Sequence, residues 1–268
     1  MLILIATPIG NLGDLSPRAQ EALQQCDLLL CEDTRHTGQL LHLAGIKAKE
    51  KRSLHKFNEA EREEEVIQLL HAGKAVGLVS DAGTPGIADP GARLVARCHA
   101  EGIKVSIIPG PCAFVAAYAL SGYTDEAFQF LGFLPKTRNE RSKLFDKMRE
   151  YSGASIVYES PYRIKETLTE VDPQWEVVMV RELTKIHEQV VRASAGELLQ
   201  QLADKEVKGE CVLIFSPSKK EKPSLEELVQ QVHHVRESFS CSVKEAIEAV
   251  AKARGVSQKD LYRLIIRG

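Results

Sequence analysis

The chain has 268 residues, of which 27% are charged and 44% hydrophobic, and its formal net charge is −2. This length suits two domains, or one core with an appendage, and this composition is typical of a soluble globular protein. No apolar run approaches the roughly 20 residues of a membrane span. The opening MLILIATPIG is too short and uncharged for a secretory signal, so we expect a cytoplasmic protein with no membrane partner.

Charge and cysteine usage exclude further classes of protein. The near-neutral charge gives no support to a large nucleic-acid footprint, so any such contact must depend on local patches. The six cysteines contain no Cys-x-x-Cys pair, which predicts buried, reduced thiols rather than disulfides or a zinc site. No His-Glu-x-x-His motif or paired His/Cys spacing indicates a metal, so we expect none.

Apolar runs alternate with helix-like segments over residues 1–120, which we take as an N-terminal α/β domain. Such alternation predicts a parallel sheet covered by helices on both faces. The expected strands are residues 2–6, 28–31, 75–79 and 104–108. Polar residues mark the expected helix starts: Ser16 before Pro17, Asn58 with Glu61, and Asp89 before Pro90.

Three of these strands end in loops rich in glycine and proline, at residues 7–11, 80–89 and 109–112. If the strands are parallel, all three loops lie at one edge of the sheet, where open α/β sheets bind ligands. Glycine and proline fix the loop shapes, so their polar groups are preorganised. The loops contain no P-loop lysine, no Gly-x-Gly-x-x-Gly fingerprint and no Gly-x-Ser-x-Gly elbow. Small residues, backbone groups and the carboxylate of Asp81 suit a ligand with an amino group, hydroxyls and a positive centre.

A second α/β domain is expected over residues 121–216. Several of its strands follow one another without helices, which predicts a mixed sheet, with residues 187–193 as the hairpin partner of 176–181. Ser160 is expected to cap one helix, and Ser194 with Glu197 another. A basic cluster opens an earlier helix and has two interpretations, an RNA grip or a solvated helix face. Its members are Lys136, Arg138, Arg141 and Lys143.

Residues 217–268 are expected to form a linker and a small helical appendage. The stretch SPSKKEKPS is a charged Pro/Ser linker. Three helices should follow, with caps at Ser224, Ser242 and Ser257, each with an acidic residue three positions later. The last two helices and their short glycine turn suit a helix-turn-helix-like module, and a dimerisation or packing module remains an equal alternative.

Long motifs in a fixed order give the chain a family resemblance. ATPIGNLGDLSPRA, CEDTRHT, LVSDAGTPGIADPGARLV, IPGPCA, GFLPK, YESPYR and RELTKIHE occur between residues 2 and 215. They resemble the ribosomal small-subunit RNA (cytidine-2′-O-)-methyltransferase branch of the tetrapyrrole methylase superfamily. The resemblance implies two α/β domains, S-adenosylmethionine as methyl donor and a homodimer. It also implies, as acceptor, a cytidine ribose in the decoding region of 16S ribosomal RNA within the small ribosomal subunit.

The resemblance also implies which residues line the cofactor cleft. They are Pro8, Ile9, Asp81, Thr84, Ile87, Cys112, Ala113 and Ser160, the last beside Glu159. Three positions depart from the branch pattern. Cys112 stands where the branch more often has Ser, Tyr162 where it often has His, and residues 192–194 lack an expected Gly.

Methyl transfer from a sulfonium is an in-line displacement, so the protein must mainly align the reacting atoms. A ribose 2′ hydroxyl also gains from a base, or from a cation that stabilises the forming alkoxide. The candidates are Glu159, Glu182, Lys185 and Arg35, with Glu32, Asp33, Arg163, His36 and His55 as further possibilities. For each charged residue the alternative is a surface ion pair or a helix cap, and Arg35 and Lys185 are also suited to bind phosphate.

Two other functions remain open at this point. One is a methylase of a small acceptor, such as a porphyrin-like macrocycle or a modified protein side chain, on the same scaffold. The other is a non-catalytic RNA-binding module that uses the terminal helices. The basic stretch and the appendage favour RNA over a macrocycle, and the intact cofactor loops argue against the pure binding function.

Overall fold

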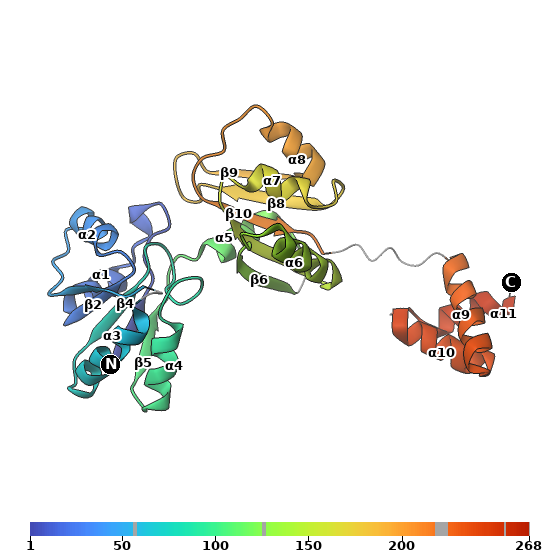
Figure 1. Cartoon of the computed structure of the whole chain (residues 1–268), viewed down its shortest axis with the longest axis horizontal. Helices are drawn as coiled ribbons and strands as arrows, with labels where there is room; N and C mark the ends of the chain where they lie inside the picture. Colours follow the sequence, from blue (N-terminus) through green and yellow to red (C-terminus); the bar gives the residue numbers. More distant parts are fainter. Residues whose placement is uncertain (56–57, 125–126, 218–224, 255, 268) are drawn as a thin grey trace. The chain divides into compact units, whose positions relative to one another are not determined.

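The structure is a computed structural model that describes residues 1–55, 58–124, 127–217, 225–254 and 256–267. The chain divides into two compact units, Met1–Pro217 and Ser218–Gly268. The larger unit contains two five-stranded sheets and the smaller unit is helical (Figure 1).

The first sheet is wholly parallel, as predicted, with strand order β3-β2-β4-β1-β5. Its strands are β1 (Leu2–Ile5), β2 (Leu28–Cys31), β3 (Lys51–Ser53), β4 (Val76–Val79) and β5 (Val105–Ile108). Strand β3 was not predicted, because this three-residue edge strand of Lys-Arg-Ser carries no apolar signal. Since β4, β1 and β5 are neighbours, their three glycine- and proline-rich exits meet at one edge.

Helices cover both faces of this sheet. Successive side chains of each strand point to opposite faces, and because the central strands are apolar on both, each face must be buried. Ile3 and Ile5 of β1 pack against α1 and α2, while Leu2 packs on the opposite face among residues of α3 and α4. These elements are α1 (Pro17–Gln25), α2 (Thr34–Leu43), α3 (Glu59–His71) and α4 (Ala92–Ala100), with a 3-10 turn η1 (Leu12–Asp14) before α1.

Of the three predicted helix caps in this sheet region, Ser16 is confirmed, Asn58 has the predicted position without the predicted bond, and Asp89 is wrong. The Ser16 side chain accepts a hydrogen bond from Ala19 N at the start of α1. Helix α3 begins directly after Asn58, as predicted, but Asn58 forms no cap bond, because its side chain accepts from His55 N instead.

Helix α4 begins at Ala92 rather than at Pro90. It follows Gly91, which has φ 124° and whose N–H donates to the carboxylate of Glu59 at 3.0 Å. A carboxylate from the neighbouring helix α3 therefore takes the place of the predicted Asp89 cap.

The second sheet is mixed, as predicted, with order β6-β7-β10-β8-β9. Only β6 and β7 pair in parallel, and β8 and β9 form the predicted hairpin. The strands are β6 (Phe128–Phe133), β7 (Ala154–Glu159), β8 (Glu176–Arg181), β9 (Gln189–Ser194) and β10 (Cys211–Phe215).

Helices α6 (Arg138–Glu150), α7 (Ile164–Thr169) and α8 (Ala195–Leu202) cover one face of this sheet. Helix α5 (Ala113–Ser121) packs on the other face through Ala117, although it follows β5 of the first sheet (Figure 1). Helix α5 thus joins an exit of the first sheet to the face of the second.

The two predicted caps in this region have opposite outcomes. Ser194 and Glu197 form the predicted capping box, and β9 runs into α8 without the turn for which a glycine was expected. Ser160 does not cap α7, because a turn at residues 161–163 intervenes and the helix starts at Ile164.

The smaller unit consists of α9 (Leu225–Phe239), α10 (Val243–Arg254) and α11 (Gln258–Arg267), packed around a core that includes Val232, Ile247 and Leu261. The predicted cap at Ser242 is present, since Ser242 and Glu245 exchange both capping bonds. Ser224, the linker residues 218–223 and the expected glycine turn at Gly255 lie outside the described residues.

Candidate functional site

A cavity of about 340 Å³ lies where the strand exits of the two sheets face each other. From the first sheet it is lined by Glu32 after β2, Ile9 after β1, residues 81–84 and 87–89 after β4, and residues 112–113 after β5. From the second sheet it is lined by Phe133, Tyr158, Glu159, Ser160, Pro161, Leu183 and residues 209–212. This volume is within the range of small-molecule and cofactor sites.

Hydrogen bonds tie the strand exits to one another. Thr7 and Gly83 form a two-bond bridge between the β1 and β4 loops, with N···O distances of 2.9 and 3.1 Å. Thr84 Oγ1 donates to Pro111 O at 2.9 Å, which joins the β4 loop to the β5 loop. The predicted convergence of the three loops is therefore confirmed, and direct hydrogen bonds hold them together.

Asp81 connects a fourth exit to this group. One of its carboxylate oxygens accepts a hydrogen bond from Asp33 N, after β2, at 3.0 Å. Gly83 beside it has φ 82°, and a Cβ there would lie 3.2 Å from Ile9. Only glycine adopts this conformation without strain, so the β4 loop can approach Ile9 closely.

The charge of the cavity wall is one-sided. Among the described residues that line it, five are acidic and none is Lys, Arg or His. The acidic residues are Glu32, Asp81, Asp89, Glu159 and Glu210. Two of these carboxylates, Glu159 and Glu210, pair with Arg163 and Lys185, which lie outside the wall. The excess of carboxylates in the wall itself favours a cationic ligand and disfavours phosphate groups.

Seven of the eight predicted cofactor residues line this cavity. They are Ile9, Asp81, Thr84, Ile87, Cys112, Ala113 and Ser160. Pro8 precedes Ile9 but is not part of the wall. Burial raises the pKa of the Cys112 thiol, so this side chain faces the cavity as a neutral group.

Glu159, a predicted catalytic residue, lines the cavity with a fully engaged carboxylate. Its Oε1 accepts from Arg163 Nε at 2.9 Å and from Ser160 N at 2.6 Å, and its Oε2 accepts from Thr167 at 2.8 Å. The side chain is 0% exposed. These contacts favour a positioning role for Glu159, because a general base needs an oxygen that can reach the substrate.

Glu182 and Lys185, also predicted to be catalytic, flank the cavity rather than line it. Lys185 Nζ binds Glu182 and the lining residue Glu210, each at 2.9 Å. Burial opposes the charge of Lys185, but its two carboxylate partners outweigh this effect and raise its pKa. Lys185 is therefore an ammonium held at the cavity rim.

The turn that carries these residues has an uncommon backbone. Glu182 and Thr184 adopt φ values of 54° and 63° without being glycine. The turn lies against Gly10 of the β1 loop, where a Cβ would come within 2.6 Å of Lys185 Cγ and 2.7 Å of Leu183 O. Backbone strain of this kind is concentrated at functional sites.

Arg35, the fourth predicted catalytic residue, is not at the cavity. Its side chain is 90% exposed and pairs with Asp33 at 2.7 Å, and this pair lowers the pKa of Asp33. The histidines considered as bases, His36 and His55, also lie outside the cavity wall. Of the β2 exit, only Glu32 faces the cavity.

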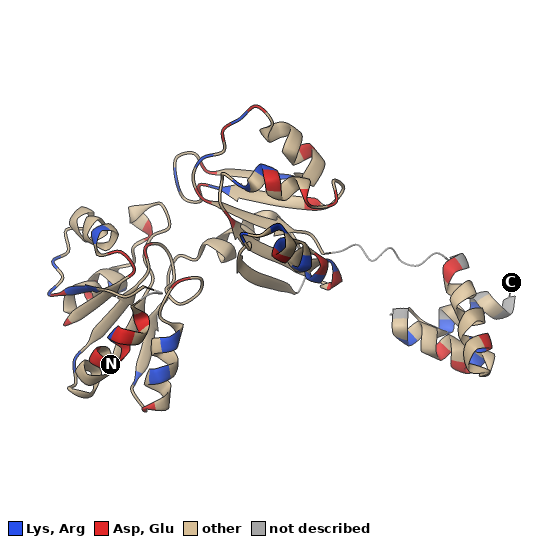
Figure 2. Ribbon diagram, in the orientation of Figure 1, with Lys and Arg blue, Asp and Glu red and all other residues tan. Residues whose placement is uncertain are grey.

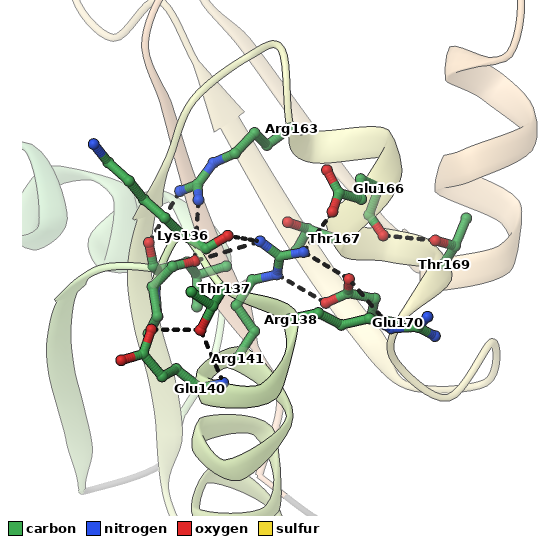
Figure 3. Close-up of polar contacts among 12 residues, drawn as sticks. Lys136, Thr137, Arg138, Glu140, Arg141, Arg163, Glu166, Thr167, Thr169 and Glu170 are labelled. Atoms are coloured by element: carbon green, nitrogen blue, oxygen red, sulfur yellow. Dashed lines mark hydrogen bonds and ion pairs between the residues drawn. The ribbon is translucent and has the colours of Figure 1, made fainter.

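The basic cluster at the start of α6 is not a uniform surface patch. Arg141 is buried, and its guanidinium binds Glu170 at 2.6 and 2.8 Å, together with Glu166 and the Lys136 carbonyl (Figure 3). Charges of both signs are interspersed along α6 (Figure 2). The RNA-grip interpretation is therefore wrong for Arg141, whereas Lys136, Arg138 and Lys143 remain exposed.

Several wall residues were missed by the sequence analysis. Phe133 and Tyr158 look like ordinary strand residues, and Gly209 and Glu210 precede a strand instead of following one. The rule that ligands bind at strand exits does not find Gly209 and Glu210, because β10 is antiparallel to β7 and β8. The GFLPK and YESPYR motifs were a usable signal for the first two.

Comparison with known proteins identifies the family. The model of the Tetrapyrrole (Corrin/Porphyrin) Methylases matches residues 1–199. The chain belongs to the tetrapyrrole methylase family. It is therefore a methyltransferase.

Two curated relatives are named ribosomal RNA small subunit methyltransferase I. The protein from Synechocystis sp. is 41% identical over 98% of this chain and 96% of its own length. The protein from Pasteurella multocida is 39% identical over 98% and 95%. A crystal structure of diphthine synthase shares the fold, with a TM-score of 0.62 and 14% identity over 81% of this chain and 90% of that one.

The structure adds three facts on other sites. Four of the six cysteines are buried, as predicted, whereas Cys112 and Cys241 are half-buried, and all six are free thiols. In the described part of the chain, no group of three or more His, Cys, Asp or Glu residues is arranged to hold a metal ion. No helix among the described residues is both long and apolar enough to cross a membrane.

Proposed function

We propose that this methyltransferase uses S-adenosylmethionine to methylate the 2′ oxygen of a cytidine ribose in the decoding region of 16S ribosomal RNA, acting in the cytoplasm on the small ribosomal subunit. The acceptor is suggested by the two relatives with names that specify small-subunit ribosomal RNA. The observation that carries the choice of donor is the cavity wall, in which acidic residues meet small and apolar ones.

The residues of this wall fit the proposed donor. Its sulfonium and amino group are cationic, so the acidic wall attracts them, while Ile9, Ile87 and Ala113 offer an apolar surface for the adenosyl group. When bound, S-adenosylmethionine supplies a methyl group on a positively charged sulfur. Asp81 lines the cavity, and the hydrogen bond from Asp33 N to its Oδ1 fixes the position of its carboxylate. The carboxylate is therefore placed to accept a hydrogen bond from this ligand.

The chain's own residues mainly position the reaction. Glu159 and Arg163 fix the β7 exit. Lys185, which the sequence analysis names as a catalytic candidate, pairs with the lining residue Glu210. An ammonium at this place would stabilise negative charge on the acceptor oxygen, or bind a neighbouring phosphate. Methyl transfer of this kind depends on alignment more than on a strong base.

The proposal is tested by incubating the protein with labelled S-adenosylmethionine and small ribosomal subunits that lack the modification. We expect label in the RNA, recovered as a 2′-O-methylated nucleoside. Label only in a small molecule would indicate the small-acceptor methylase, and tight RNA binding without label would indicate the non-catalytic module. Either result would contradict the proposal.

We also propose that the protein is a homodimer. Strand β5, helix α5 and strand β6 follow one another in the chain and leave large apolar side chains about half exposed. These are Ile107, Val115, Leu120 and Phe128. Strands β5 and β6 are edge strands of their sheets, and exposed apolar residues at sheet edges favour association.

Light scattering after size exclusion tests this second proposal. We expect the mass of two chains for the native protein and of one chain for Val115→Glu, because a charge in an apolar interface opposes association. Leu43→Glu, at an exposed position of α2, is the matched control and should remain dimeric. A monomeric native protein would contradict the proposal.

A further inference from the structure

Large apolar side chains remain exposed around the mouth of the cavity. Phe133 lines the cavity, yet 62% of its surface is exposed. Tyr162 follows directly after the lining residues Ser160 and Pro161 and is 87% exposed. Single exposed apolar residues need no explanation, but their grouping at the mouth of a site indicates a binding surface.

The backbone of β6 is shaped to bring Phe133 to this mouth. Regular alternation would place Phe133 on the opposite face of the strand from Phe130. The β6–β7 register shifts between these two residues, and Gly132 between them has φ 71°. Both rings therefore lie against Tyr158, with centroids 4.9 and 5.3 Å away. Bulges beside active sites commonly re-aim a side chain in this way.

The segment that follows Phe133 is held firmly in place. Leu134 N donates to Tyr158 O at 3.1 Å. Arg163 donates to the carbonyls of Leu134 and Pro135, each at 3.0 Å, and Arg141 donates to the carbonyl of Lys136 at 2.9 Å (Figure 3). The phenylalanine ring is thus positioned in advance while its face stays open, which lowers the entropy lost when a ligand binds.

The charges on the two sides of the Phe133 ring differ in sign, with carboxylates in the cavity and basic residues in the segment that follows the ring. The acidic cavity disfavours phosphate groups, so the phosphates of an RNA acceptor would stay outside it. Lys136 and Arg138 are exposed three and five residues beyond Phe133. The Lys136 ammonium points away from the Arg141 cluster (Figure 3), whereas Arg138 lies 3.8 Å from a carboxylate oxygen of Glu170. Aromatic faces next to exposed cations suit an unstacked nucleotide, with its base on the ring and its phosphates on the cations.

We propose that Phe133 stacks on a base of the RNA acceptor at the cavity mouth and holds this nucleotide out of its helical stack with the ribose toward the cavity. The inference deepens the proposed function and rests on it. It assigns Phe133 to acceptor recognition rather than to the donor. A ribose reaches a buried methyl group only if its nucleotide is single-stranded or flipped.

Steady-state methylation of small ribosomal subunits by Phe133→Leu and Phe133→Trp tests the inference. Loss of one base–aromatic stack should raise the KM for the subunit roughly 5- to 150-fold in Phe133→Leu. Phe133→Trp should keep a KM near that of the native protein, because tryptophan also stacks. The donor Kd, measured by calorimetry, should change far less than this KM in both variants, although Phe133 belongs to the cavity wall. Leu43→Ala, which also removes an exposed apolar side chain, is the control and should change neither value.

Tryptophan fluorescence gives a second measurement. If Phe133 had only a structural role, RNA would not change the emission of a tryptophan at this position. The chain has one tryptophan, Trp175, which is buried, so Phe133→Trp adds an exposed emitter at the cavity mouth. We expect RNA from the acceptor region to quench this emission.

Equal KM values for the Leu and Trp variants, absence of quenching, or a rise in donor Kd as large as the rise in KM in Phe133→Leu would each overturn the inference. The proposed function fails separately, if the native protein leaves the subunit RNA unmodified.

Discussion

Single residues at the site have geometries that separate their roles. Asp81 has one oxygen on Asp33 N and faces the cavity, whereas both oxygens of Glu159 bind protein donors. The first arrangement suits ligand binding and the second suits support of the wall.

Asp81→Ala should weaken S-adenosylmethionine binding by about 1–3 kcal/mol, because a polar group of the ligand would lose its partner. Asp81→Asn should weaken binding less, since its amide oxygen can still accept from Asp33 N and hold the β2 exit in place. Calorimetry measures both affinities. An unchanged Kd in Asp81→Ala would remove this residue from the donor site.

The buried Arg141–Glu170 pair predicts a pH dependence of stability. The hydrogen bond from Arg141 lowers the pKa of Glu170 below its ordinary value of 4.5. A lowered carboxyl pKa stabilises the fold above that ordinary value, and the contribution is lost as pH falls through the folded-state pKa. The pair should therefore matter at neutral pH and not in acid.

Glu170→Gln should lower the free energy of unfolding by about 1–3 kcal/mol near neutral pH. The effect is limited because Glu166 and the carbonyls of Pro135 and Lys136 still hold the buried guanidinium. The difference from the native protein should shrink as the solution is acidified below the ordinary carboxyl pKa. Glu166→Gln is the matched control and should have a smaller effect, since its side chain is 57% exposed. Denaturant unfolding across pH measures these values. A difference that does not vary with pH would contradict the assignment.

At the scale of elements, the site depends on loops that touch across the two sheets. The β1 loop meets the strained turn after β8 at Gly10, where any side chain would collide with backbone and side-chain atoms of that turn. This contact links a donor-side loop to the segment that carries Lys185.

Gly10→Ala should therefore reduce stability by about 1–3 kcal/mol and also weaken donor binding, because overpacking would push the two loops apart. Gly38→Ala is the control: its Cβ would meet only the flexible end of Lys51, and alanine favours the α2 helix. Thermal unfolding and calorimetry give both quantities. Unchanged donor affinity in Gly10→Ala would show that the contact does not support the site.

The elements also show what the sequence could and could not predict. Buried strands such as β1 and β4 were predicted because four or more apolar residues in a row admit few other structures. The positions of the three loops at the strand exits were predicted because glycine and proline restrict the backbone locally. The Asp89 and Ser160 caps were wrong because contacts from elsewhere, the Glu59 carboxylate and the turn at residues 161–163, determine where α4 and α7 begin.

Site residues that depend on long-range geometry were the hardest to predict. Glu210 reaches the cavity through antiparallel pairing of β10, and Phe133 through a bulge of one strand. Arg141 was placed in a surface cluster because its two glutamate partners follow 25 and 29 residues later. No local pattern records such distant contacts.

At the scale of the whole molecule, the chain combines a methylase unit with a separate helical unit. The larger unit, Met1–Pro217, contains the entire cavity, and the smaller unit has its own apolar core. Exposed residues of α11, among them Lys259 and Tyr262, are of the types that contact RNA.

Truncation after Ser216 should therefore leave donor affinity unchanged but impair methylation of the small subunit. Calorimetry and the labelling assay, run side by side, separate the two effects. Native activity on the subunit would exclude the helical unit from acceptor recognition, and lost donor binding would show that the larger unit needs it.

The central claim is that four converging strand exits and the facing second sheet hold a sulfonium donor in one acidic cavity. A crystal structure with bound S-adenosylmethionine tests it most directly. We predict the adenosyl group between Ile9 and Cys112, with the methyl group directed toward the mouth near Phe133. A donor bound at any other surface, with this cavity left empty, would contradict the claim.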